Sequence, residues 1–368
     1  MRYHIYLKLF VSDALPVARN KAVLSSTQED RSPGIPSLAV AEPPFSNPST
    51  DLALHTSDNV SFHVWKSILR EASPVFADMF ELGKRPVQQP RSVANGHEGG
   101  DRKHQPNGST SEPTPVLVLP ELTSTTLRHL LLTIYPPPTF VFTSLDDIKP
   151  VLAVAHKYQM DAVMDSLRDV LVHDFMKDEV LRVFCIATLY AMPRAQEAAA
   201  RQFLSFSTTS AAGAYADELQ DVDAKSYYQL LACRRECAST LAEATRDLSW
   251  FQDGAWAFTT LGVNCECSRD PNLRSLRGPE GGNVGRHIKW WFIAHYERCA
   301  AVLQDKPCSE ALEEPTLCDQ ALREATRCEG CRENVHDHMR FFMKSFREYV
   351  DGKVSQASLP SGSFQLWH

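Results

Sequence analysis

The amino-acid sequence predicts an α+β fold: a small sheet beside a cluster of helices, followed by a mostly α-helical C-terminal domain. Apolar and polar residues alternate over residues 51–64, which is typical of half-buried strands. Several later segments instead carry apolar residues at i, i+3, i+4 and i+7, which is typical of amphipathic helices. Strands and helices do not alternate regularly, so a sheet built from βαβ units is not expected.

The composition is that of a globular protein. The chain has 368 residues, enough for two or three domains, with 43% hydrophobic and 23% charged residues and a formal net charge of −7. Residues 1–50 are rich in proline after the first few positions and show no sustained helical or strand period. We therefore expect a disordered leader over residues 1–50.

A β-hairpin is expected next, because the turn Ser57-Asp58-Asn59 separates two alternating runs. Two short helices should follow, the first beginning at Lys66 and the second at Pro74, with Ser73 as its N-cap. Residues 83–114 are rich in Gly, Pro, Gln, Asn and Ser and have no apolar periodicity. This composition predicts a disordered insertion.

One strand and four helices are expected after the insertion. Val116–Leu119 is a short apolar run, and helical stripes follow in residues 127–134, 151–158, 163–171 and 180–189. The start of the helix that contains residues 151–158 is left open. Pro150 fits the first turn of that helix, whereas Ser144 can cap either the same helix or a separate turn ahead of it. Asp161 is the expected N-cap of the third helix, and Pro193 the expected end of the fourth.

Residues 51–80 resemble the opening of a BTB/POZ domain. The residues that carry the likeness are Asp51, Phe62, Lys66, Leu69, Ser73, Phe76, Met79 and Phe80. Downstream, Val116–Pro120, Thr126–Tyr135 and Val151–Met164 are similar to the third strand and the following helices of that family. The resemblance covers residues 51–175, and the overall layout looks like that of the BTB proteins of mushroom-forming fungi.

The resemblance implies a protein-interaction module that recruits a cullin-type ubiquitin ligase or associates with another BTB chain. Many BTB dimers place a helix ahead of the first strand, whereas residues 30–50 here are rich in proline, so homodimerisation is left open. The apolar-x-Glu element of many cullin adaptors is not found in residues 81–86. Cullin recruitment is therefore expected only by analogy of fold.

The C-terminal half, residues 176–355, is expected to be an all-α domain, with a disordered tail at residues 356–368. One long helix should begin at an Asp221 N-cap and run to about Leu248, and another should cover residues 288–302. The clearest apolar stripe runs from Val335 to Val350. We interpret the aromatic residues and methionines of these stripes as core.

The ten cysteines crowd toward the C-terminus. Cys265 and Cys267 form a C-x-C pair and Cys328 and Cys331 a C-x-x-C pair, and four thiolates can close the tetrahedral shell of a structural zinc ion. Buried reduced thiols are the interpretation that we favour over zinc, and disulfides are a third alternative that a reducing compartment disfavours. Cys233 and Cys237, four residues apart on one helix, are expected in the core, like the lone His295.

Several function classes are excluded by what the sequence lacks. It has no phosphate-binding, dinucleotide-binding, metalloprotease or serine-hydrolase motif, so no catalytic residue is predicted. Cys299 with His295 suits helix packing as well as it suits a nucleophile and base. No apolar run has the length of a membrane span, no signal peptide is recognised, and a pI near 6.0 argues against nucleic-acid binding.

We therefore expect an intracellular protein of the cytoplasm or nucleus that is not an enzyme and acts as a BTB-type adaptor or scaffold. Its expected partners are proteins, and structural zinc is the one cofactor that the sequence suggests. The alternative is a zinc-stabilised regulatory protein that acts in transcription or associates with nucleic acid.

Overall fold

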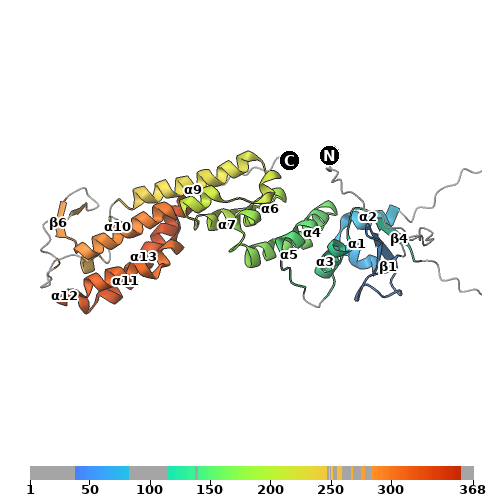
Figure 1. Cartoon of the computed structure of the whole chain (residues 1–368), viewed down its shortest axis with the longest axis horizontal. Coiled ribbons are helices and arrows are strands. Elements are labelled where there is room, and N and C mark those ends of the chain that lie inside the picture. The colour runs from blue at the N-terminus through green and yellow to red at the C-terminus, as the bar shows by residue number, and fades with distance from the viewer. Residues whose placement is uncertain are drawn as a thin grey trace, which may run out of the picture.

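The chain forms an elongated molecule, with the sheet near one end and the C-terminal helices at the other (Figure 1). The computed structural model describes residues 38–82, 114–136, 140–246, 248, 250–251, 255–258, 267, 275–277 and 283–357. The expected architecture is confirmed for these residues: a mixed α+β region with a small four-stranded sheet precedes a mostly helical C-terminal part.

The sheet has the strand order β1-β3-β2-β4. Its strands are β1 (Ala39–Val40), β2 (Leu52–Thr56), β3 (Val60–Val64) and β4 (Val116–Leu119). β2 and β3 form the predicted antiparallel hairpin, with Leu54 opposite Phe62 and Asn59 at a positive φ of 59° in the turn. β1 pairs with β3 and β4 pairs with β2, both in parallel.

Residues 38–50 are ordered, although the sequence predicted disorder as far as residue 50. β1 extends the sheet, and the side chain of Phe45 is fully buried, with its ring 5.9 Å from that of Phe62 and 5.2 Å from that of Tyr135. The neighbouring prolines rule out a helix but allow an extended chain that carries Phe45 into the core. Residues 1–37, 83–113 and 358–368 of the predicted disordered segments lie outside the described residues.

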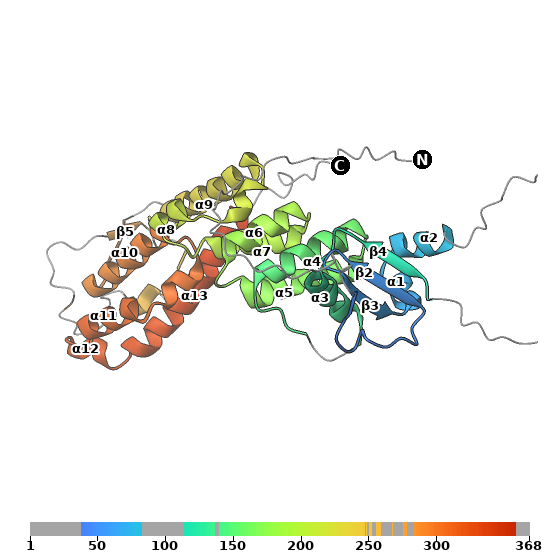
Figure 2. The same ribbon diagram turned by 45° about the vertical axis from the view of Figure 1, so that its right-hand side comes forward.

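The first two helices lie beside the sheet, and the helices after β4 lead from it toward the C-terminal end of the molecule (Figures 1 and 2). The helices are α1 (Lys66–Ala72), α2 (Pro74–Leu82), α3 (Ser124–Ile134), α4 (Leu145–Lys157), α5 (Asp161–Val170), the π-helical turn η1 (Leu171–Phe175), α6 (Val180–Leu189), α7 (Pro193–Phe203) and α8 (Thr208–Gly213).

Two details of the predicted helix ends are settled or corrected. α4 begins at Leu145, because Ser144 Oγ accepts a hydrogen bond from the Asp146 N–H at 3.1 Å, and Pro150 lies within the helix. Asp161 is the first residue of α5 and Met160 holds the N-cap position, so the predicted Asp161 cap was wrong. Pro193 begins α7, which explains why α6 ends before it.

The described C-terminal residues form a short strand pair and the remaining helices. The elements are η2 (Asp217–Gln220), α9 (Ala224–Ala244), η3 (Ala255–Phe258), β5 (Ser275–Arg277), β6 (Asn283–His287), α10 (Trp290–Asp305), η5 (Ser309–Glu313), α11 (Pro315–Ala325), α12 (Glu329–Arg332) and α13 (Val335–Gln356). The antiparallel pair of β5 and β6 was not expected in an all-α region. α9 is capped by Asp223, not Asp221, because the Asp223 carboxylate accepts from the Ser226 N–H.

Two large hydrophobic cores divide the described residues. The first core runs from Ala41 to Leu230 and joins the sheet to α3–α7, so it continues past the domain boundary that the sequence placed after residue 175. The second core runs from Leu241 to Val350 and contains the predicted apolar stripe of α13. α9 contributes to both, and Leu204, Cys233, Cys237 and Cys308 form a third, small cluster that shares its neighbour Val354 with the second core.

Candidate functional site

Three of the four cysteines predicted as zinc ligands meet in the second core. Cys267 comes from the connection between α9 and α10, Cys328 holds the N-cap position of α12, and Cys331 lies within α12. The Cys331 N–H donates to the Cys328 carbonyl at 3.1 Å, which makes the tight turn that places both thiols on one side of the chain. The fourth predicted ligand, Cys265, lies outside the described residues.

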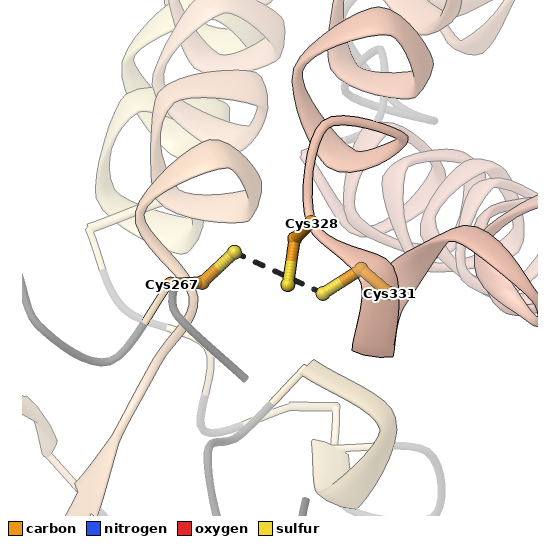
Figure 3. Close-up of side chains that lie close together, drawn as sticks. All are labelled: Cys267, Cys328 and Cys331. Atoms are coloured by element: carbon orange, nitrogen blue, oxygen red, sulfur yellow. Dashed lines mark hydrogen bonds between the residues drawn. The ribbon is translucent and has the colours of Figure 1, made fainter. Parts of the chain in front are cut away.

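The geometry of the three thiols suits a tetrahedral metal ion. Their sulfur atoms lie within 4.8 Å of one another, and Figure 3 shows the three side chains converging on one point. The Sγ atoms of Cys267 and Cys331 are 3.8 Å apart. Sulfurs bound at about 2.3 Å to a tetrahedral zinc ion stand about 3.8 Å from one another. This cluster of Cys267, Cys328 and Cys331, called the cysteine triad below, is therefore able to bind zinc.

The triad is shielded from solvent, since its members are only 4–6% exposed. Burial among several thiols is typical of structural zinc sites. The arrangement suits a role in holding chain segments together.

The other described cysteines are buried, except for Cys318, which is partly exposed. None of the nine cysteines that the structure describes takes part in a disulfide. Burial raises the pKa of Cys185 to about 12 and that of Cys308 to about 11, so both stay protonated at neutral pH. Cys233 and Cys237 are 7% and 1% exposed, as the sequence predicted for core thiols.

His295 and Cys299 form a packed pair of α10 with no access to solvent. His295 Nδ1 lies 3.1 Å from the Leu317 carbonyl oxygen, and Nε2 lies 3.6 Å from Cys299 Sγ. Burial lowers the pKa of His295 to about 4 and raises that of Cys299 to about 12. A protonated, inaccessible thiol is a poor nucleophile, so the pair agrees with the core interpretation.

The predicted BTB signature residues join the hairpin to the helices that follow it. The Asp51 carboxylate accepts from the Lys66 N–H at 2.8 Å and so satisfies the start of α1. Phe62 and Leu69 are buried in the first core. Trp65, at the N-cap position of α1, provides no side-chain cap.

Ser73 links the start of α2 to the end of α4. Its buried Oγ accepts from the Phe76 N–H at 3.1 Å and donates to the Tyr158 carbonyl at 2.6 Å, which confirms the predicted N-cap. The ring of Phe76 stacks on that of Tyr158, with 4.6 Å between centroids and 8° between planes. Met79 and Phe80 are half-buried against the same core.

A buried ion pair was missed by the sequence analysis. Glu218 of η2 is 1% exposed and accepts hydrogen bonds from Arg182 of α6, whose Nε lies 3.1 Å from both carboxylate oxygens. Burial raises the pKa of Glu218, but the hydrogen bonds and charges of Arg182 and Lys149 outweigh burial and hold it below the usual value. No sequence signal pointed to this pair, because charged residues are normally exposed and these two are distant in the chain.

The comparison with protein families agrees with the resemblance over part of its range. A family model described as the BTB/POZ domain matches residues 103–175, so the chain carries a BTB/POZ domain there. The described part of this range includes β4, α3, α4, α5 and η1. The signature residues 51–80 lie ahead of the match and their family role stays a prediction, as does the fungal subgroup. No curated protein matches the chain.

None of the helices in the described parts of the chain is long and apolar enough to cross a membrane.

Proposed function

We propose that the protein is a non-catalytic adaptor or scaffold that acts inside the cell by binding other proteins through its BTB domain. The observation that carries the proposal is the BTB/POZ match at residues 103–175, because this domain is a protein-interaction module. The packing of β4 and α3–α5 into one core with the predicted signature segment supports it. The burial of Cys299 and His295 supports the absence of catalysis by that pair.

The sheet edge formed by β4 supports protein contact. β4 is the last strand in the order of the described sheet, and Val116 and Val118 are 52% and 60% exposed on it. An edge strand with exposed valines leaves backbone hydrogen-bonding groups and apolar surface available to another chain.

The proposed partners are a cullin-type ubiquitin ligase or a second BTB chain. Both come from family analogy, and fold alone does not decide between them. Capture of the tagged full-length chain from its native cell, read for cullins and for BTB proteins, separates the two outcomes.

The capture is sharpened by a matched pair of variants. Val118→Lys places a charge on the exposed face of β4, while Val141→Lys does the same at a valine that is 66% exposed ahead of α4. We expect the partner to be lost with V118K and kept with V141K. Recovery of neither a cullin nor a BTB protein, together with a monomeric mass by light scattering, would reject the adaptor role.

A second candidate function, a zinc-stabilised regulatory protein, is favoured by the cysteine triad. We propose Cys265 as the fourth thiolate, because it stands two residues before Cys267 and completes the sulfur shell that zinc prefers. Metal analysis of the purified chain tests this: about one zinc per chain is expected, and less than about a tenth would reject the site. The net charge of −7 gives the nucleic-acid part of this alternative no support, and a salt-dependent shift on DNA is not expected.

A further inference from the structure

We propose that metal binding at the cysteine triad controls the folding of the second core, while the first core, which contains the BTB domain, stays folded without metal. This inference rests on the zinc site proposed above and assigns that site a regulatory role. Metal availability would thereby decide whether the C-terminal helices pack into one core.

The triad joins two segments that are far apart in the chain. Cys267 belongs to the connection that leads from α9 to α10, and Cys328 and Cys331 belong to the corner between α11 and α13. An unfolded chain does not hold these thiols together, so the metal binds the folded arrangement. Binding to the folded form alone stabilises that form by mass action.

The described part of the connection between α9 and α10 consists of short elements: the 4-residue turn η3 and the strand pair of β5 and β6. Phe258 of η3 anchors the connection by stacking on Phe292 of α10 at 3.9 Å, and Lys289 donates from its N–H to the Phe258 carbonyl at 2.9 Å. Cys267 is the next described residue after this anchor and is 4% exposed. A metal bond at Cys267 therefore adds a fixed point to the connection between η3 and β5, beside the packing of Phe258 and the pairing of β5 with β6.

The metal also stabilises a corner that is small by itself. α12 has 4 residues, and its N-cap, Cys328, makes no side-chain capping bond. Both of its cysteines are buried among the residues of the second core, which also includes Met339 and Phe342 of α13. Coordination of Cys328 and Cys331 holds α12 in place and thereby fixes the position at which α13, which begins three residues later, packs against the second core.

The first core has no share in the triad. Its buried residues end at Leu230, whereas the second core begins at Leu241 and contains all three cysteines. The two cores are joined by α9 and by a few contacts beside it, such as those of Arg234 with the Phe206 and Asp305 carbonyls, and each core has its own buried interior, so they need not unfold together. Loss of the metal is therefore expected to act chiefly on the second core.

Hydrogen exchange of the full-length chain, read by mass spectrometry, tests the inference. The protein is compared as purified with Zn²⁺, after removal of metal by a chelator, and after Zn²⁺ is added back. We expect amides of α10 and α13 to exchange at least about tenfold faster without metal, amides of α4 and α6 to change less than about twofold, and Zn²⁺ to restore protection.

Two variants distinguish an effect of losing the metal site from an effect of replacing any cysteine. Cys331→Ser should reproduce the metal-free pattern and resist rescue by Zn²⁺, whereas Cys318→Ser, at a partly exposed cysteine of α11 outside the triad, should behave like the wild type. If C331S fails to fold, chelation of the wild-type chain still decides the question.

The outcomes distinguish this inference from the zinc site on which it rests. Stoichiometric zinc whose removal leaves α10 and α13 protected would overturn the inference and keep the zinc site. Loss of protection in both cores would overturn the independence of the first core. Absence of bound zinc after purification and after Zn²⁺ addition would reject both.

Discussion

Replacing Arg182 with methionine should destabilise the first core by about 2–3 kcal/mol. The Glu218 side chain is 2% exposed, and Arg182 Nη2 lies 2.9 Å from its Oε1. After the substitution Lys149 is the nearest cation, with its Nζ 3.7 Å from the same oxygen. Removing one partner of a buried ion pair costs about 3–5 kcal/mol because a buried charge is left uncompensated. The remaining Lys149 and the partial exposure of Arg182, 24%, reduce the expected cost to or just below the lower limit of this range, about 2–3 kcal/mol.

A double-mutant cycle gives the sharper test of this reasoning. Arg182→Met combined with Glu218→Leu should cost less than about 1 kcal/mol, because no buried charge remains. Arg168→Met is the control: Arg168 pairs with Asp165 and Asp169, which are 68% and 63% exposed, so its loss should cost less than about 1 kcal/mol.

Hydrogen exchange in low denaturant is the suitable assay, because it reads the first core through α4 and α6 without assuming that the whole chain unfolds in one step. The reasoning is refuted if R182M costs less than about 0.5 kcal/mol, or if the double variant is as unstable as R182M.

Three further substitutions have defined outcomes. Ser73→Ala should lower the stability of the first core by about 1–2 kcal/mol, because it removes the α2 cap and the hydrogen bond to the Tyr158 carbonyl. Ser67→Ala, at an exposed position of α1, is the control and should leave the stability unchanged in the same hydrogen-exchange measurement. Phe346→Ala should destabilise the second core by about 3–5 kcal/mol, since Phe346 is fully buried. Phe341→Ala is the control and should cost less than about 1 kcal/mol, because Phe341 is 50% exposed. Thermal unfolding compares the two variants, and equal costs would contradict this packing. Burial lowers the pKa of His295 to about 4, so this imidazole binds a proton more readily in the unfolded chain than in the folded one. The free energy of unfolding of the second core should therefore fall by about 2–3 kcal/mol between pH 7 and pH 4. His295→Leu should remove that part of the pH dependence, and an unchanged slope would contradict it.

Local signals in the sequence were sufficient for the hairpin and most helices. Ser73 before Pro74 marked the start of α2, and the stripe from Val335 to Val350 marked α13, because capping and helical periodicity depend on neighbouring residues. Asp221 and Asp223 both fit an N-cap, but Asp221 is the C-cap of η2, so α9 starts after Asp223. Phe45 was missed because its burial depends on partners such as Tyr135 that lie far along the chain.

The candidate site could be predicted in its chemistry and not in its assembly. The C-x-x-C spacing pointed to Cys328 and Cys331, since two thiols on one turn share a ligand-binding side. That Cys267 meets them across 64 positions follows from the packing of α10 against α11, which no local pattern contains. The buried pair of Arg182 and Glu218 is unpredictable for the same reason, because two charges become compatible with burial only when the fold brings them together.

The native size of the endogenous protein tests the central claim, that this chain works by binding other proteins, most directly. A gentle extract of the native cell is separated by size, and the fractions that contain the chain are analysed by mass spectrometry. The account predicts that most of the chain elutes in an assembly larger than the free protein, together with a cullin or another BTB chain. Elution of the whole population at the mass of the free chain, with neither partner in those fractions, would contradict it.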